Sequence, residues 1–436
     1  MKIFIHLVDL VGPQNACIGL GQQLIRRGHS VYFLINGDFA NKFSRFSKKF
    51  IILPLETPRL EAEKNAVELN AENFSELGLF GPISPIMKVK KMFGSEFIQG
   101  SERNADFYES QIKAYIQQEK PDVIMVDAQL MSPCLMNSSI PWVYIFCCNP
   151  LGLFCDLPLP PFSSGLPIDA DPKEWSEFRK ILHKDYFDKV VEVQKKLCDK
   201  YQYPHPKNQI FCPRSPYLNI YQFPKELNYD DRCTLPEHYC RVDTFIRDDP
   251  EPFELPNELK SKMKPGDKLI FLSMGSMGSC NIKLMRTLIA ILAKTPHFYI
   301  VSKGMLHDQY ELADNMWGEA YVRQIKIIPM VDLIIFHGGN NTLTETFYFG
   351  KPMIILPLFF DQFDNAQRVH EKGFGIRLNI DSFTEKDLLD AIETLLNDQT
   401  LKDRLIEAKN RINQSQSLSH ACERIERIVQ ANQKLD

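Results

Sequence analysis

Three polar loops carry the side chains best suited to bind an anionic, hydroxyl-rich ligand. They read SMGSMGS at 273–279, FHGGNNTLTE at 336–345 and PLFFDQFDNAQ at 357–367, and each follows an apolar run typical of a buried strand. Glycine and serine loops that lead into a helix offer N–H and hydroxyl groups to phosphate. Because parallel strands end at one edge of a sheet, the sequence predicts that the three loops converge on one point.

The loop at 336–345 contains more than a helix start requires. Thr342 and Glu345 have the spacing of a capping box, and Gly350 is placed to end a short helix. A cap alone does not require the histidine and two glycines at 337–339, or Asn341 beside the first turn. An anion held on exposed helix N–H groups would use them all.

A nucleotide sugar would satisfy the three loops together. We expect its phosphates on His337 and the helix N-terminus, a ribose hydroxyl on Glu345, and sugar hydroxyls on Asp361 and Gln362. The alternatives are structural: His337 as a helix-end cap, Asp361 as an ordinary N-cap, and Glu345 as the partner in the capping box.

Apolar periodicity predicts two α/β units, each a doubly wound parallel sheet. Strands are expected at 3–8, 29–35, 50–53, 122–127 and 142–146, and again at 268–273, 297–302, 325–329, 331–336 and 352–358. Residues 150–170 read as a long loop, 173–201 as one helix, and 202–262 as irregular structure that includes the linker. Two such units facing each other place the ligand site in the cleft between them.

Composition and charge narrow the possible classes of protein and of binding partner. A hydrophobic content of 44% and a formal net charge of −4 describe a globular chain with no reason to bind nucleic acid. The eleven cysteines form no zinc-type spacing, so we expect no metal, and their odd number favours a reducing compartment. The first residues read as a strand rather than a signal peptide, and no run spans a bilayer. We therefore expect a soluble, cytoplasmic monomer with no membrane partner.

The segment from His337 to Gln367 resembles the donor-binding signature of the UDP-dependent glycosyltransferases of family 1. Their pattern is H-x-G-x-N-[ST]-x-x-E, then G-x-P, then D-Q-x-x-N-A. A looser likeness covers the whole chain, and the stretch from Asn15 to Gly19 is most similar to soluble mite members. The resemblance implies the GT-B fold, two Rossmann-like domains facing across a cleft: residues 1–240 for the acceptor and 241–415 for the UDP-sugar. A final helix over 416–436 would pack back on the first domain.

Carried over by motif, the family's pattern implies that one set of residues holds the UDP-sugar and that no cofactor is needed. The family's W-x-P-Q segment reads YVRQ here, with Arg323 in place of proline. The implied donor-binding residues are Gly275, Ser276, Tyr321, Val322, Gln324, His337, Gly339, Asn341, Thr342, Glu345, Asp361 and Gln362.

One family residue is missing. The catalytic histidine of the pattern V-G-H-x-N is Pro13 here, whereas the aspartate that orients it is present as Asp127. Proline cannot take a proton, so three readings remain. The chain has lost its chemistry, the acceptor ionises with little help, or the base comes from elsewhere. Under the last reading the candidates are Asp127 through a water, or Asp9, His183 or Asp185.

We expect an inverting glycosyltransferase that moves a hexose to an acidic acceptor such as a flavonoid, another plant phenol or another xenobiotic, in a detoxification role. Free phenols titrate near pH ~10 and need less base than aliphatic alcohols. No arginine stands next to Asp361 and Gln362, which favours glucose over glucuronic acid. The alternatives are a nucleotide-sugar-binding protein without activity and a UDP-sugar epimerase of the same architecture. The expected acceptor wall consists of Phe80, Ile86, Met92, Phe146, Phe154, Leu157 and Phe178.

Overall fold

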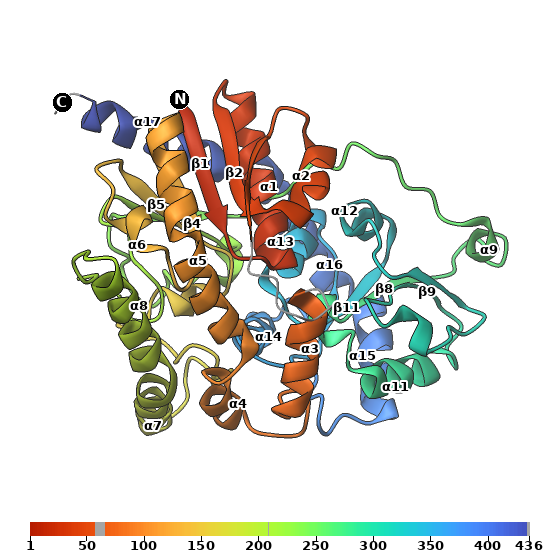
Figure 1. Ribbon diagram of the computed structural model, residues 1–436. Coiled ribbons are helices and arrows are strands. Elements are labelled where there is room, and N and C mark those ends of the chain that lie inside the picture. Colours follow the sequence, from red (N-terminus) through yellow and green to blue (C-terminus); the bar gives the residue numbers. More distant parts are fainter. Residues whose placement is uncertain (57–65, 208, 434–436) are drawn as a thin grey trace.

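The computed structural model describes residues 1–56, 66–207 and 209–433 and contains two parallel sheets, each covered by helices (Figure 1). The fold is α/β with two Rossmann-like domains, as the sequence predicts. Strands rich in valine and isoleucine are buried on both faces, which is why the sheets lie between helical layers.

The first sheet is doubly wound. The chain starts in the middle of the sheet, runs to one edge, and then crosses to the other side, so β1 and β4 are neighbours at the switch point. In spatial order its strands are β3 (Ile51–Leu55), β2 (Ser30–Asn36), β1 (Lys2–Leu7), β4 (Val123–Asp127), β5 (Trp142–Phe146), β6 (Leu218–Gln222) and β7 (Tyr239–Val242).

The second sheet repeats this winding, with its switch point between β8 and β11. In spatial order its strands are β10 (Met316–Glu319), β9 (Phe298–Ser302), β8 (Leu269–Ser273), β11 (Leu333–Phe336), β12 (Met353–Ile355) and β13 (Ile376–Arg377).

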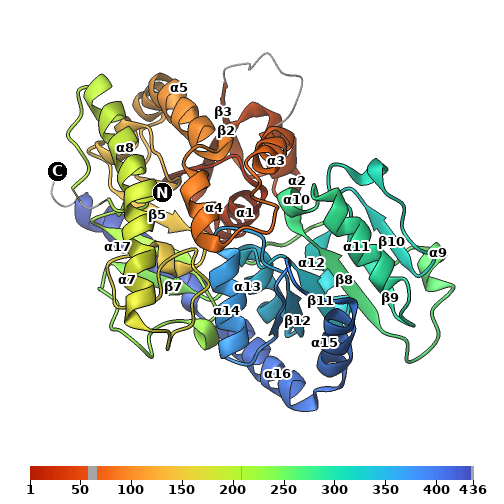
Figure 2. The same cartoon turned by 90° about the horizontal axis from the view of Figure 1, so that it is seen from below.

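Helices cover both sheets, and the helix that ends the described chain crosses between the domains (Figure 2). The last helix, α17, packs against β6, β7 and α1 of the first domain. The helices are α1 (Val11–Arg26), α2 (Ala40–Phe46), α3 (Ala66–Glu76), α4 (Pro85–Met92), α5 (Glu96–Glu119), α6 (Pro133–Met136), α7 (Pro172–Leu182), α8 (Asp188–Lys200), α9 (Asn257–Lys260), α10 (Gly275–Gly278), α11 (Ile282–Leu292), α12 (Gln324–Ile327), α13 (Asn340–Phe349), α14 (Gln362–Glu371), α15 (Glu385–Asn397), α16 (Gln399–Gln414) and α17 (Ser417–Asn432).

Side-chain contacts to one glutamate fix the crossing helix to the first domain. Both Arg27 and His29 contact the carboxylate of Glu426, at 2.8 Å each. The expected helix was to reach residue 436, and residues 434–436 lie outside the described residues.

Four sequence-based expectations about elements are wrong. Residues 202–262 contain β6 and β7 instead of being irregular throughout, and the expected strand at 325–329 is α12 followed by a 3₁₀ turn. Strand β10 was not expected. The expected helix at 173–201 is interrupted by a π-helical turn, His183–Phe187, between α7 and α8.

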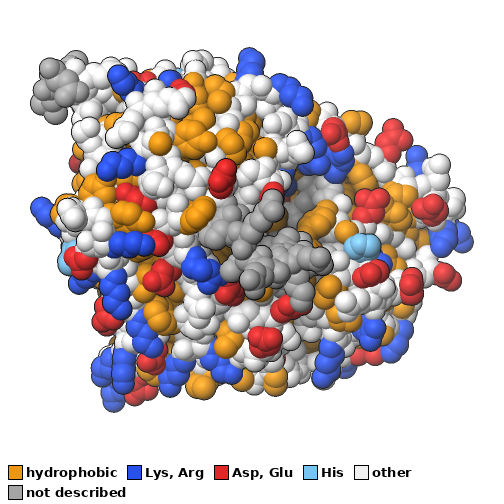
Figure 3. All heavy atoms as spheres, viewed as in Figure 1, with side chains coloured by type: hydrophobic (Ala, Val, Ile, Leu, Met, Phe, Trp, Pro, Cys, Tyr) orange, Lys and Arg blue, Asp and Glu red, His pale blue; other side chains and the backbone are white. Residues whose placement is uncertain are grey.

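The surface carries both signs of charge. On the face shown in Figure 3, lysines and arginines alternate with aspartates and glutamates rather than forming a patch of one sign. Within the described ranges, no helix combines the length and the apolar character needed to cross a bilayer.

Candidate functional site

A cleft of about 320 Å³ lies where the two sheets face each other, at the carboxyl ends of β1, β4, β8 and β11. Both switch points therefore open into it, as expected for paired doubly wound sheets. Helices α1 and α13, which begin at this edge, contact each other across the domains. Of the predicted donor residues, the cleft is lined by Gly275, Ser276, Tyr321, Val322, Gln324, His337, Gly339, Asn341, Thr342, Asp361 and Gln362.

The ring of His337 lies between two glycines. A Cβ added at Gly339 would come within 2.5 Å of His337 Nε2, and one added at Gly275 within 2.6 Å of the same atom. The ring Nδ1 lies 3.4 Å from the carbonyl oxygen of Ser273. Burial lowers the pKa of His337 to about 4, although the Ser273 contact opposes this shift. The ring is therefore neutral at pH 7 in this structure.

Helix α13 begins at Asn340, with Gly339 as its N-cap and no side chain capping it. The expected capping box of Thr342 and Glu345 is wrong, because the N-cap is three residues earlier, at Gly339, and Glu345 is engaged elsewhere. The N–H groups of its first turn therefore have no side-chain acceptor and open toward the cleft, beside His337. Gly350 ends the helix in the left-handed conformation at φ 64°, as predicted.

Glu345 is 1% exposed and lies behind the residues that line the cleft. Its carboxylate accepts from Asn341 Nδ2 at 2.7 Å, from Gln324 Nε2 at 2.6 Å, and from the guanidinium of Arg247. Arg247 lines the cleft and was missed by sequence reasoning, because a single arginine in a proline-rich linker has no local signal.

Asp361 and Gln362 also line the cleft, where α14 begins. Asp361 does not cap α14 with its side chain; Oδ2 accepts from the backbone N–H of Asn149 at 2.9 Å. Burial raises the pKa of Asp361 to about 7. Gln362 accepts through Oε1 from the N–H groups of Leu358 and Phe359, which leaves its amide nitrogen to donate to a ligand.

Asp127 is the predicted base candidate that the structure brings to the cleft. It ends β4, is 8% exposed, and its Oδ2 has no hydrogen-bond partner among the described residues. Burial raises the pKa of Asp127 to about 7, whereas the Cys147 thiol, which donates to it, opposes the rise. Cys17, Cys147 and Asp127 present atoms within 4.8 Å of one another, a set that could hold a thiophilic cation. Pro13 lines the cleft in the first turn of α1.

The other three base candidates do not line the cleft. Asp9 accepts from the Tyr108 hydroxyl at 3.4 Å, and burial raises its pKa to about 6. His183 pairs with Asp188 at 3.4 Å, in the π-helical turn that also carries Asp185.

The predicted acceptor wall is brought together only in part. Met92 and Phe146 line the cleft, whereas Phe80, Ile86, Phe154, Leu157 and Phe178 pack in or against the hydrophobic core. Sequence reasoning missed most of the aromatic wall, because its members come from distant segments. Only the pair before Asp361 stands in a motif. The missed aromatic residues are Phe74, Phe97, Tyr144, Phe211, Phe359 and Phe360.

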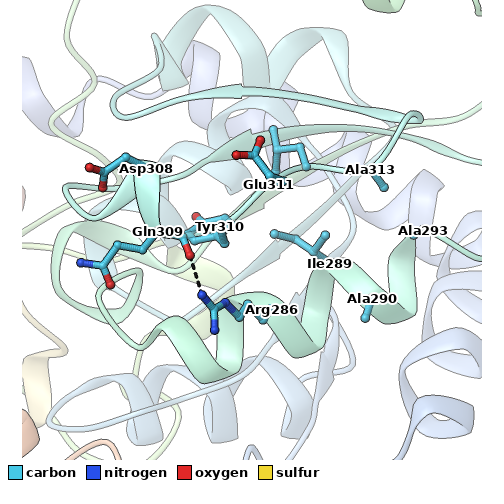
Figure 4. A pocket seen from close by; sticks show the side chains of 10 residues that line it. Arg286, Ile289, Ala290, Ala293, Asp308, Gln309, Tyr310, Glu311 and Ala313 are labelled. Carbon is cyan, nitrogen blue, oxygen red and sulfur yellow. Dashed lines mark hydrogen bonds between the residues drawn. The ribbon is translucent and has the colours of Figure 1, made fainter.

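A second depression, of about 550 Å³, lies on α11 of the second domain and is distinct from the cleft (Figure 4). Arg286 donates across it to the carbonyl oxygen of Gln309 at 2.7 Å. Its charged side chains, Arg286, Asp308 and Glu311, are exposed to solvent. We assign no function to it.

Comparison with known proteins gives one family. The sequence model described as UDP-glucoronosyl and UDP-glucosyl transferase matches residues 244–418. The chain is 22% identical to a zeaxanthin glucosyltransferase of Pseudescherichia vulneris over 95% of each chain. It is 24% identical to UDP-glucuronosyltransferase 2A3 of Cavia porcellus, over 88% of this chain and 75% of that protein.

Solved structures agree on the fold. The glycosyltransferase of kitacinnamycin superposes with a TM-score of 0.68 at 17% identity, over 98% of each chain. The glycosyltransferase VinC, solved with dTDP, gives 0.65 at 14% identity, over 99% of this chain and 100% of that one. Both are GT-B proteins, so the two domains described above have the GT-B arrangement.

Proposed function

Because this chain is a UDP-glycosyltransferase of family 1 with the GT-B fold, we propose that it transfers glucose, with inversion, from UDP-glucose to a lipophilic acceptor with an acidic O–H or S–H group. One observation carries the proposal. The predicted donor residues and an aromatic wall line one cleft, and Asp127 lines it as well.

The donor side supplies the groups that a departing diphosphate needs. The uncapped first turn of α13 offers N–H groups, and Ser276 and Thr342 offer hydroxyls to the phosphate oxygens. As the bond from the anomeric carbon to the phosphate oxygen breaks, UDP keeps the electron pair, and these donors stabilise its growing negative charge.

The acceptor side of the cleft supplies an apolar wall and a general base. The acceptor oxygen attacks the anomeric carbon from the face opposite UDP, which inverts that centre, and its proton passes to the carboxylate of Asp127, which lines the cleft. A carboxylate whose pKa is raised to about 7 is a stronger base than an ordinary aspartate, yet far weaker than an alkoxide. Acidic acceptors therefore need the least assistance from the general base, so phenols such as flavonoids are the proposed acceptors. Glucosylation of such compounds would be consistent with a detoxification role.

The charges in the cleft favour a neutral sugar. Arg247 is the one guanidinium among the described residues that line the cleft, and it is paired with Glu345. The sugar end, near Asp361 and Gln362, has a buried carboxylate instead. A uronate would meet this carboxylate without a cation to balance it, so we propose glucose rather than glucuronic acid.

The test is transfer from UDP-glucose to a panel of phenols and alcohols of graded acidity, with products identified by mass. We expect β-glucosides whose rates of formation rise as the acceptor pKa falls. Asp127→Asn keeps the size of the side chain and should bind UDP normally while losing most of the transfer rate. Equal rates for phenols and simple alcohols, or full activity in Asp127→Asn, would contradict the proposal.

Pro13→His provides a companion variant. It places an imidazole in the first turn of α1, in the cleft that Asp127 also lines. We expect turnover of phenols to survive and less acidic alcohols to become acceptors, because the dyad would then supply a stronger base. An unchanged acceptor range would mean that base strength does not limit the reaction.

A further inference from the structure

Two buried cysteines lie beside Asp127 at the carboxyl end of the first sheet. Cys17 belongs to α1, Cys147 directly follows β5, and Asp127 ends β4. The two sulfur atoms and a carboxylate oxygen all lie within 4.8 Å of one another. Cys147 and Asp127 line the cleft, whereas the side chain of Cys17 is fully buried. The three side chains therefore form one cluster that is reached from the cleft.

The negative charge of this cluster is not balanced by the protein. No lysine, arginine or histidine among the described residues forms an ion pair with Asp127. Its Oδ2 atom is buried and has no hydrogen-bond partner in the described ranges. A buried carboxylate oxygen in this position lacks the interaction that would offset its loss of water. A cation held between the three side chains would supply that interaction.

The types of atom in the cluster select the kind of cation. Zinc and similar soft divalent ions bind thiolate sulfur and carboxylate oxygen, and sites with three protein ligands keep a fourth position for a small molecule. Magnesium and calcium prefer oxygen ligands alone, so they fit two sulfur atoms poorly. The cleft beside Cys147 and Asp127 gives a cation an entry path and room for the fourth ligand.

Local sequence spacing does not reveal this cluster, because its members come from three separate elements. Val126 of β4 is opposite Tyr144 of β5, so Asp127 and Cys147 follow neighbouring strands at the same edge of the sheet. Helix α1 starts at this edge and brings Cys17 to them. The expectation that the chain binds no metal was based on spacing along the sequence alone.

We propose that Cys17, Cys147 and Asp127 bind a soft divalent cation, Zn²⁺ or Cd²⁺, and that the bound cation blocks sugar transfer. Each thiol releases its proton to solvent as its sulfur–metal bond forms, and Asp127 binds through a carboxylate oxygen. A carboxylate bound to a cation no longer accepts the proton of the sugar acceptor. This blocking step rests on the proposed function, in which Asp127 is the general base, whereas binding of the cation does not.

Binding is tested by titrating the full chain, reduced and freed of metal with a chelator, with Cd²⁺. Cadmium–thiolate bonds absorb ultraviolet light, so the absorbance reports the number of sulfur ligands. Cys17→Ala and Cys147→Ala should each lose about half of the absorbance of the tight site and weaken binding by about tenfold or more, since even residues behind metal ligands have effects of that size. Asp127→Asn should keep the absorbance and bind Cd²⁺ more weakly. Zn²⁺ should displace Cd²⁺ from the wild type.

Cys198→Ala is the matched control for the cysteine variants. Cys198 is as buried as Cys17, but it belongs to α8 and lies outside both the cleft and the cluster. Its replacement should leave the affinity for Cd²⁺ and the absorbance of the tight site as in the wild type. If Cys17→Ala does not fold, Cys17→Ser has nearly the original size and carries the same expectation.

The blocking step is tested by measuring glucose transfer from UDP-glucose to a phenol as Zn²⁺ is added. Each rate is compared with the metal-free rate of the same protein. The wild type and Cys198→Ala should lose transfer as the site fills. Cys17→Ala should need about tenfold more Zn²⁺ or above for the same loss, in line with its weaker binding.

Two results would overturn the inference. Equal Cd²⁺ absorbance and affinity in the wild type, Cys17→Ala and Cys147→Ala would place the cation elsewhere, and a filled site with an unchanged rate of transfer would disprove the blocking step. Failure of the proposed function has a different signature. The metal-free wild type would then transfer no sugar, while the cysteine variants would still differ from it in Cd²⁺ binding.

Discussion

At the scale of single residues, the position of the His337 ring requires that Gly275 and Gly339, which lie on either side of it, have no side chain. Gly339 has ordinary extended angles, φ −60° and ψ 133°, so alanine would suit its backbone. A methyl group there would nevertheless fall 2.5 Å from Nε2 of the ring. Glycine is therefore required at position 339 because of the space that the His337 ring occupies, and not because of the backbone conformation.

Gly339→Ala is therefore expected to weaken UDP binding by about tenfold or more, the loss of one hydrogen bond to a charged group. The reason is that the ring must turn away from the helix N-terminus. Calorimetry measures the change. Gly94→Ala is the control, since its Cβ would only reach ordinary contact, 3.7 Å from the Lys91 carbonyl oxygen. Equal UDP affinity in Gly339→Ala and wild type would contradict this role of the ring.

UDP binding is also expected to take up a proton at His337. The carbonyl oxygen of Ser273 only accepts, so Nδ1 carries the hydrogen and a neutral ring has no donor at Nε2. A diphosphate beside the ring favours the charged form and raises the pKa from about 4. Calorimetry at pH 6.5 in buffers of different ionisation enthalpy, chosen near the His reference pKa of about 6.5, should show this uptake. His337→Gln should lack it, and equal uptake in both proteins would refute the prediction.

Sequence reasoning found those site residues that stand within motifs. His337, Asn341, Asp361 and Gln362 follow buried strands at fixed spacing, and the structure places all four on one cleft. Arg247 has no such spacing, because its position comes from backbone contacts with α1. The identity of the catalytic base could not be predicted for a similar reason. Asp127 and Asp9 both stand at strand ends in the sequence, and only the folded structure shows that Asp127 lines the cleft and Asp9 does not.

At the scale of elements, local patterns predicted the central strands better than the edge strands. Runs such as residues 122–127 are buried on both faces, so their composition alone indicates a strand. Strands β6 and β7 lie at one side of the sheet within a proline-rich segment. They are strands because β6 pairs with β5 and β7 pairs with β6. In α12, Ile325 and Ile327 are buried by a helix where alternation predicted a strand, since packing overrides β propensity.

Helix α1 and the linker form one structural unit, and Gly19 lies at their contact. An alanine in a helix is ordinarily more stable than glycine by about 0.5–1 kcal/mol. At position 19 the added Cβ meets two backbone carbonyl oxygens, at 2.0 and 2.8 Å, and neither can turn aside like a side chain. We expect Gly19→Ala to lower the free energy of unfolding by about 1–3 kcal/mol.

The control for this prediction lies on the same helix. Gly12 has no atom within 4 Å of an added Cβ, so Gly12→Ala should be neutral or stabilising by about 0.5–1 kcal/mol. Urea unfolding measures both variants. Gly19→Ala should also weaken UDP binding, because the linker that carries Arg247 must shift. A Gly19 variant as stable as the Gly12 variant would show that the helix and linker separate at little cost.

At the scale of the whole molecule, the two domains are joined by buried polar contacts whose charges are not all balanced. Asp364 accepts from the backbone N–H groups of Ser163 and Gly165 across the interface, and burial raises its pKa to about 8. Asp243, by contrast, is held with its pKa well below the usual range, because ion pairs with Arg411 and Arg241 outweigh its burial. The first group opposes folding at high pH, and the second at low pH.

Burial of Asp127 in the cleft makes it a stronger base and lowers the stability of the fold at high pH. Its pKa is about 7 in the fold against 3.8 for the ordinary group, so the folded state holds the proton more tightly. Folding stability from this group is therefore full below about pH 4 and is lost as the pH rises through about 7. We expect Asp127→Asn, which cannot ionise, to be more stable than wild type at pH 8 and to differ less from it at pH 5. Urea unfolding at the two pH values measures this difference. A difference in stability that is the same at both pH values would mean that the Asp127 carboxylate is not desolvated in the ligand-free cleft. Asp127→Asn is also the variant expected to lose sugar transfer.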